Sequence, residues 1–250
     1  MRRHLFAICV GIVAFGLGAV TAILLGQRIY REDTKVSPVV AEQFPPAAKP
    51  TDCKDSNSYP GISRPVSELK KYKNGYFPVG AFDDGWQNDD DGKNAWYGKA
   101  LRVINEKSLL DRADDSTEIY RFLWMRTFDH PVSVRFERIG YSFRLSSAET
   151  SGMGGYEPGR KWRTDNDIPV TEEEWCHFIS LLENASFWRQ ESNDRDIGND
   201  GSQWVLEGLR RNRYHLVDRW SPQSGGYREA CTYLLKLSGR DPEKIGNGLY

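Results

Sequence analysis

The chain has 250 residues, with 34 lysines and arginines against 35 aspartates and glutamates and a formal net charge of −1. This balance, with a sequence pI of about 6.5, excludes the basic footprint of a nucleic-acid-binding protein, so we expect no nucleic-acid partner. Eight tryptophans, 12 tyrosines and 11 phenylalanines argue against a disordered chain and predict a domain with a sizeable core.

Residues 5–26 form a run of 22 residues without a charged side chain. As a helix the run would be about 33 Å long, enough to cross a bilayer core of about 30 Å. Arginines flank it on both sides, so we expect residues 1–26 to be an uncleaved transmembrane anchor. Two alternatives stay open: a signal peptide cleaved near the small residues at 20–22, and a buried soluble helix.

The orientation of the anchor follows from its short N-terminal tail. Lysines and arginines on the two sides come close to a tie, but a short cationic tail before a long domain is typical of a signal anchor. We therefore expect a single-pass protein of the inner (plasma) membrane whose C-terminal domain lies outside the cytoplasm. Scattered prolines predict a tether over residues 27–60, followed by one globular domain over residues 61–250.

The first half of the domain predicts a helix and three strands. Asn94 is a candidate cap for a helix. Residues 118–128 are apolar on both alternating sets, as in a central strand. Residues 132–137 alternate apolar and polar side chains, and residues 141–145 predict a third strand. Short joins between the three indicate an antiparallel meander.

The glycine-rich residues 146–170 predict a flexible loop or lid. The clearest helix follows it, because Thr171 and Glu174 spell a capping box. Apolar side chains then recur at helical spacing, which predicts a buried stripe. Its members are Trp175, Phe178, Ile179 and Leu182.

Residues 203–209 and 214–220 predict a hairpin around a polar turn. A turn centred on residues 211 and 212 pairs Glu207 with Leu216 and makes Asp218 its diagonal neighbour on one face. Residues 227–238 predict a last amphipathic helix, ended by Gly239. The expected fold is α+β: an antiparallel sheet, built from the meander and the hairpin, with amphipathic helices packed on it.

The hairpin supplies the candidate site residues. Glu207 and Asp218 are candidate catalytic carboxylates, with His215 beside them, because paired carboxylates in different environments can act as acid and base. The competing interpretation is that an arginine of the hairpin neutralises one carboxylate. On the opposite face Trp204 meets Arg219, and these two are candidate binding residues.

Three cysteines lie outside the anchor, so at least one is unpaired within a monomer. We expect a disulfide between Cys176 and Cys231, because both belong to helices that should pack on one sheet, whereas Cys53 lies in the tether. No metal site is predicted, because the best calcium-loop match, residues 196–207, has Gly198 at a ligand position. No cofactor is predicted.

Four segments resemble a group of uncharacterised bacterial membrane-anchored proteins. They are residues 96–101, 120–126, 155–159 and 214–222, and the resemblance covers most of residues 95–240. It implies a bacterial origin and, because the group has no assigned activity, no functional residue.

These features favour a binding module over an enzyme. The sequence has no H-E-x-x-H, no G-x-S-x-G and no phosphate loop. We expect an extracytoplasmic interaction or ligand-binding domain with a protein partner in the membrane or envelope. The alternative is a membrane-tethered hydrolase that uses Glu207 and Asp218. A purely structural subunit of a membrane complex fits the sequence equally well.

Overall fold

The computed structural model describes Cys53 and residues 62–83, 90–114, 116–194, 198 and 200–240. All of them belong to the second of two compact units, Met1–Ala48 and Lys49–Tyr250. The expected anchor and the expected boundaries of the tether lie outside the described residues. Within the described part, no helix combines the length and the apolar character that crossing a bilayer requires.

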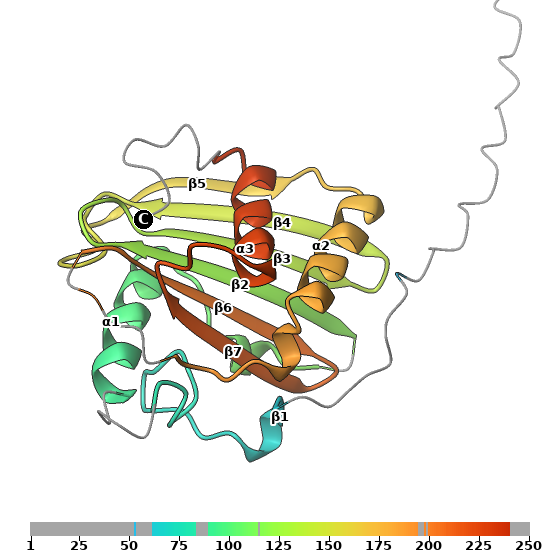
Figure 1. The fold of residues 1–250 in the computed structure, drawn as a ribbon, viewed down its shortest axis with the longest axis horizontal. Coiled ribbons are helices and arrows are strands. Elements are labelled where there is room, and N and C mark those ends of the chain that lie inside the picture. Colours follow the sequence, from blue (N-terminus) through green and yellow to red (C-terminus); the bar gives the residue numbers. More distant parts are fainter. Residues whose placement is uncertain are drawn as a thin grey trace, which may run out of the picture. The chain divides into compact units, whose positions relative to one another are not determined.

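Seven antiparallel strands form one sheet in the order β1-β7-β6-β2-β3-β4-β5, as Figure 1 shows. Their bounds are β1 Arg64–Pro65, β2 Thr117–Arg126, β3 Val132–Ile139, β4 Ser142–Thr150, β5 Lys161–Ile168, β6 Ser202–Arg210 and β7 Arg213–Trp220. The meander β2–β3–β4 and the hairpin β6–β7 meet where β2 pairs with β6. The expected α+β fold with an antiparallel sheet is confirmed.

Helices cover both faces of the sheet. The α-helices are α1 Asp90–Val103, α2 Glu172–Asn184 and α3 Gly226–Leu237, and short 3-10 turns are η1 Val66–Glu68, η2 Leu109–Arg112 and η3 Phe187–Arg189. Side chains of α2 and α3 pack on one face, where Figure 1 shows both helices crossing the sheet. Side chains of α1 and of residues 62–83 pack on the other face.

Strand β2 is the centre of the core, and all ten of its residues are buried. Tyr120, Phe122 and Trp124 point toward α2 and α3. Ile119 and Leu123 point toward α1. A strand that is buried on both faces needs apolar residues on both alternating sets, which is the pattern that identified it in the sequence.

Two of the expected helices have the predicted inner faces. The Thr171 hydroxyl accepts a hydrogen bond from the Glu174 amide at 3.2 Å, and the Glu174 carboxylate accepts one from the Thr171 amide at 2.8 Å. This capping box starts α2, whose predicted stripe is buried. Helix α3 buries Ala230 and the neighbouring apolar positions. Gly239 follows α3 with a φ of 74°, a conformation that favours glycine.

Helix α1 begins at Asp90, four residues before the expected cap. Asn94 is buried inside the helix, and its amide donates to the Phe77 carbonyl at 3.2 Å. Asp91 is suited to the first turn of α1, because a carboxylate stabilises the positive end of the helix dipole.

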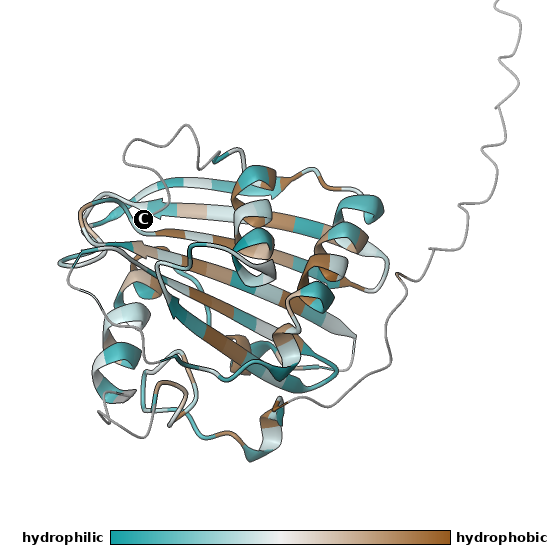
Figure 2. Ribbon diagram, in the orientation of Figure 1, coloured by the Kyte–Doolittle hydropathy of each residue, from teal (hydrophilic) through white to brown (hydrophobic). Residues whose placement is uncertain are grey.

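The prediction of a loop over residues 146–170 is wrong in two places. Strand β4 continues to Thr150, and β5 occupies Lys161–Ile168. Strand β5 lies at the edge of the sheet and is mostly exposed, so its sequence carries no apolar alternation. Figure 2 shows this hydrophilic edge beside the hydrophobic central strands.

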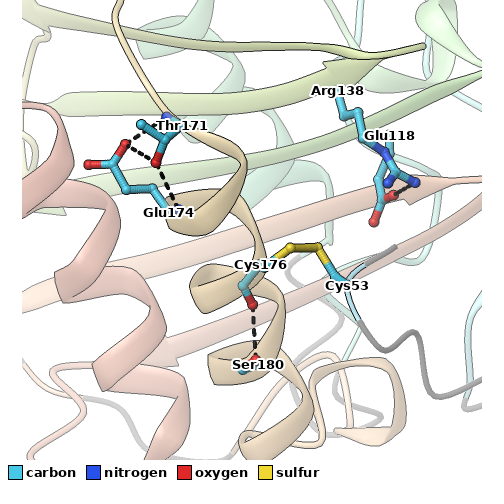
Figure 3. Close-up of a disulfide and its surroundings, with 7 residues drawn as sticks. All are labelled: Cys53, Glu118, Arg138, Thr171, Glu174, Cys176 and Ser180. Atoms are coloured by element: carbon cyan, nitrogen blue, oxygen red, sulfur yellow. Dashed lines mark hydrogen bonds and ion pairs between the residues drawn. A yellow bond between two sulfur atoms is a disulfide. The ribbon is translucent and has the colours of Figure 1, made fainter. Parts of the chain in front are cut away.

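The expected disulfide is also wrong. Cys53 pairs with Cys176 on α2, and their Cα atoms lie 5.1 Å apart (Figure 3). Cys231 is a buried free thiol on the inner face of α3. The error has a simple cause: Cys176 lies beside the buried stripe of α2 and remains half-exposed, so it does not face the sheet with Cys231.

Candidate functional site

The register of the β6–β7 hairpin is the predicted one. Glu207 pairs with Leu216, and Val205 pairs with Asp218. Glu207 therefore lies on the same sheet face as Asp218, beneath α1. Trp204 lies opposite Arg219 on the face that α2 and α3 cover.

Glu207 is fully buried and bound on both oxygens. Its Oε2 accepts the Nε–H of Arg121 at 2.7 Å and lies 2.5 Å from Arg121 Nη2. Its Oε1 accepts the hydroxyl of Tyr214 at 2.8 Å. Burial raises the pKa of Glu207, and Arg121 and Tyr214 oppose that rise. The arginine comes from β2, where it is the cross-strand neighbour of Glu207, and not from the hairpin.

Asp218 has separate partners on α1. Its Oδ2 accepts the Lys93 ammonium at 3.0 Å and the Tyr97 hydroxyl at 3.2 Å. Burial raises the pKa of Asp218, and the nearby Lys93 ammonium opposes this. These bonds fasten the first turns of α1 to β7.

The two carboxylates do not form an open catalytic pair. Glu207 is 0% exposed and Asp218 is 2% exposed, and each is engaged by a cation and a tyrosine. General acid–base hydrolysis requires both groups to reach a substrate. The geometry therefore gives the hydrolase hypothesis no support.

The other sequence candidates are buried or half-buried, and His215 is among the residues that line a small hollow described below. His215 packs against the Phe187 and Trp188 rings, at centroid distances of 5.1 and 6.1 Å, and burial lowers its pKa to about 4. Trp204 is fully buried. Arg219 donates to the Glu191 carbonyl at 2.8 Å, which holds the segment before β6 against β7. The structure does not bring these residues together at a surface.

The pockets on the described domain include the following two. A groove of about 470 Å³ runs between α2 and α3 and is lined by groups of both charges, including His177, Arg228, Glu229 and Lys236. A smaller hollow of about 80 Å³ lies between β7 and residues 62–83. Glu207 and Asp218 line neither of them.

Four exposed large apolar side chains, three of them aromatic, come from the connections at one end of the sheet, and we call them the aromatic patch. Its members and their exposed fractions are Phe128 at 48%, Met153 at 47%, Tyr156 at 62% and Trp162 at 50%. The rings of Phe128 and Tyr156 lie 6.3 Å apart, and Trp162 meets His130 edge-on at 4.7 Å. The patch comes from the β2–β3 connection, the β4–β5 connection and the start of β5.

The β4–β5 connection that carries the patch is hydrogen-bonded to the β2–β3 turn. The amide of Gly154 donates to the Asp129 carbonyl at 2.9 Å, and that of Gly155 donates to the Thr127 carbonyl at 3.1 Å. A Cβ atom on Gly154 would lie 2.4 Å from the Arg126 carbonyl oxygen, so only glycine permits this close approach. The connection is therefore fixed to the β2–β3 turn.

Three cations flank Trp162 of the patch in the chain. Arg160, Lys161 and Arg163 are exposed, and none forms an ion pair with another described residue. The Arg163 guanidinium lies 4.8 Å from the Trp162 ring centroid. Two carboxylates of the same connections are already paired, Asp129 with Arg126 and Glu157 with Lys99. The patch is thus aromatic and positively charged.

The aromatic patch was not predicted from the sequence, because its residues follow no common periodicity. The available signal was the concentration of large apolar side chains in glycine-rich turns, where solvent exposure is the rule. Comparison with known proteins adds no information on the site: no protein-family model, no curated protein and no solved structure matches the chain.

Proposed function

We propose that the chain is a membrane-tethered, extracytoplasmic module that binds a partner protein through the aromatic patch. The observation that carries this proposal is the exposure of Phe128, Met153, Tyr156 and Trp162 on connections that backbone hydrogen bonds join to each other. Aromatic residues, methionine and arginine are the side chains enriched at protein–protein interfaces. Contiguous exposed apolar groups rimmed by polar residues mark such interfaces.

The rigidity of the patch supports binding. Ordering an interface loop on association costs free energy, and a loop that is already fixed avoids that cost. The hydrogen bonds of Gly154 and Gly155 hold the β4–β5 connection in place before any partner arrives.

The charge of the patch defines the partner. Arg160, Lys161 and Arg163 attract an acidic surface and accelerate its encounter, an effect that salt weakens. We therefore infer a partner protein with carboxylates around an apolar contact.

The disulfide supports the proposed compartment. Disulfides persist in oxidising environments such as the bacterial periplasm and are rare in the cytosol. The Cys53–Cys176 bond joins the chain to α2, whereas the β4–β5 connection lies toward the opposite end of the sheet (Figure 1). The patch is therefore clear of the point where the N-terminal chain meets the described domain.

Site-specific photo-crosslinking in intact membranes tests the binding surface. A photoreactive phenylalanine analogue at Tyr156 should give one defined crosslinked product. The same analogue at Tyr141, which is 83% exposed in the β3–β4 turn away from the patch, is the matched control and should give none. Arg160→Glu should reduce the product at Tyr156. Equal products at both positions, or no effect of Arg160→Glu, would contradict the proposal.

A fusion of alkaline phosphatase after Tyr250 tests the compartment separately. The enzyme is active only outside the cytoplasm, so we expect an active fusion. An inactive phosphatase fusion together with a fluorescent cytoplasmic reporter would reverse the proposed orientation and leave the disulfide without an oxidising environment.

A further inference from the structure

Strand β5 is an open edge of the sheet. It pairs with β4 on one side, and no described strand lies on the other. Six of its eight residues are exposed, and Thr164 and Ile168 are half-buried. Such an edge offers unpaired backbone donors and acceptors to another strand.

The charges of β5 are ordered along the strand. Cations occupy the first half, at Lys161 and Arg163, and anions the second half, at Asp165 and Asp167. This order is self-complementary in an antiparallel pair. In an antiparallel pair, directly opposed side chains lie on the same face of the sheet. A twofold axis between two identical strands therefore places one residue opposite the same residue of the second copy.

We propose that β5 pairs with β5 of a second copy of this chain about a twofold axis at Thr164. That register places Arg163 of each copy opposite Asp165 of the other, within the stretch where β5 keeps a continuous register with β4. Opposite charges across a strand pair are stabilising, and like charges are destabilising.

Neighbouring registers are worse. An axis at Arg163 places two arginines opposite each other, and an axis at Asp165 places two aspartates opposite each other. An axis at Trp162 opposes Lys161 to Arg163. Thr164 is thus the position among these that leaves no like-charge pair.

The regular geometry that this pairing needs is confined to three central residues of β5. Its register with β4 is continuous from Arg163 to Asp165 and shifts on both sides of that stretch. Asp165 contacts Arg240 at 3.5 Å and Asp167 contacts Arg144 at 3.0 Å, yet their side chains stay 58% and 70% exposed. Each carboxylate therefore retains room for a second cation.

The opposite edge of the sheet limits the assembly to two copies. Strand β1 has two residues, and one of them, Pro65, has no N–H to donate. A contact that is made by the same surface on both copies closes as a dimer and does not propagate. The dimer goes beyond the proposed function, because it requires only β5.

Charge reversal tests the dimer in the full chain, solubilised in detergent and studied by sedimentation velocity over a range of concentrations. The wild type should dimerise. Arg163→Asp and Asp165→Arg each create two like-charge contacts, so each should weaken dimerisation on the order of tenfold to a hundredfold. A mixture of the two variants should form a heterodimer, because each substituted residue then faces an opposite charge.

The mixture makes the test independent of folding defects, since a misfolded variant would not recover dimerisation when mixed. A monomeric wild type would overturn the proposal. Single variants that dimerise like the wild type would also overturn it, because charge reversal in β5 does not change the affinity of a dimer that forms through another region.

Discussion

Glu207→Gln should destabilise the domain although the two side chains have the same size. The substitution keeps one oxygen but removes the negative charge that Arg121 requires. Arg121 is fully buried, so its guanidinium would be left without its main counterion. Its remaining contacts are the Lys107 carbonyl at 2.6 Å and Glu106 at 3.4 Å.

The size of the effect follows from these contacts. Removing one partner of a buried ion pair costs about 3–5 kcal/mol when nothing replaces it. Glu106 is a second, longer-range counterion for Arg121, so we expect the lower end, about 3 kcal/mol. For a domain of this size, 1 kcal/mol shifts the melting temperature by about 2–4 °C. The melting temperature should therefore fall by about 6–12 °C.

Thermal unfolding followed by circular dichroism measures this shift. Glu157→Gln is the matched control, because its ion pair with Lys99 is exposed and should contribute at most about 1 kcal/mol. The double variant Arg121→Met with Glu207→Leu should regain most of the loss, since no buried charge then lacks its counterion. A Glu207→Gln protein that melts like the wild type would refute the reasoning. Such a result would return Glu207 to consideration as a functional carboxylate.

Three other changes have defined outcomes. The pKa of His215 is about 4 in the fold against 6.5 for the free side chain, so the unfolded chain binds more protons as the pH falls below 6.5. The wild type should therefore lose about 2 kcal/mol between pH 7 and pH 5 from this residue, and His215→Phe should remove that part of the pH dependence in urea titrations. Non-reducing peptide mapping should recover Cys53 linked to Cys176, and Cys176→Ser should cost about 2–4 kcal/mol in the same titrations. Gly154→Ala should displace the β4–β5 connection, which faster amide hydrogen exchange there would reveal, and should abolish crosslinking from Tyr156.

The local elements were predictable where one short stretch contains the whole signal. The capping box of Thr171 and Glu174 is complete within four residues, and the stripe of α2 follows directly from it. The hairpin register was predictable because apolar and polar side chains alternate along both strands and a short polar turn joins them. With that turn, a single pairing buries the apolar face.

Features that depend on the order of the strands were not predictable. The partner of Glu207 is Arg121, 86 positions earlier in the chain, and they meet because β6 lies beside β2. The disulfide depends on which side of α2 the chain passes at Cys53. Strand β5 gave no signal because an exposed edge has no core to impose alternation.

The prediction of the candidate site was wrong for a related reason. Glu207 and Asp218 were candidates because they are charged residues on strand faces that are otherwise apolar. Those are also the charges that a fold must neutralise internally, and the structure gives each of them a cation and a tyrosine. Exposed side chains in turns, such as Tyr156, break no pattern and so attract no notice.

The two proposed surfaces share charges, and this couples them. Arg163 contributes to the positive field around the aromatic patch and also faces Asp165 of the second copy in the dimer. An acidic partner that neutralises Arg163 removes part of what holds the dimer together. Coupling between two binding events is reciprocal, so dimerisation lowers the affinity for the partner by the same factor. Arg160 lies outside β5 and contributes to the patch alone, so substitutions there separate partner binding from self-association.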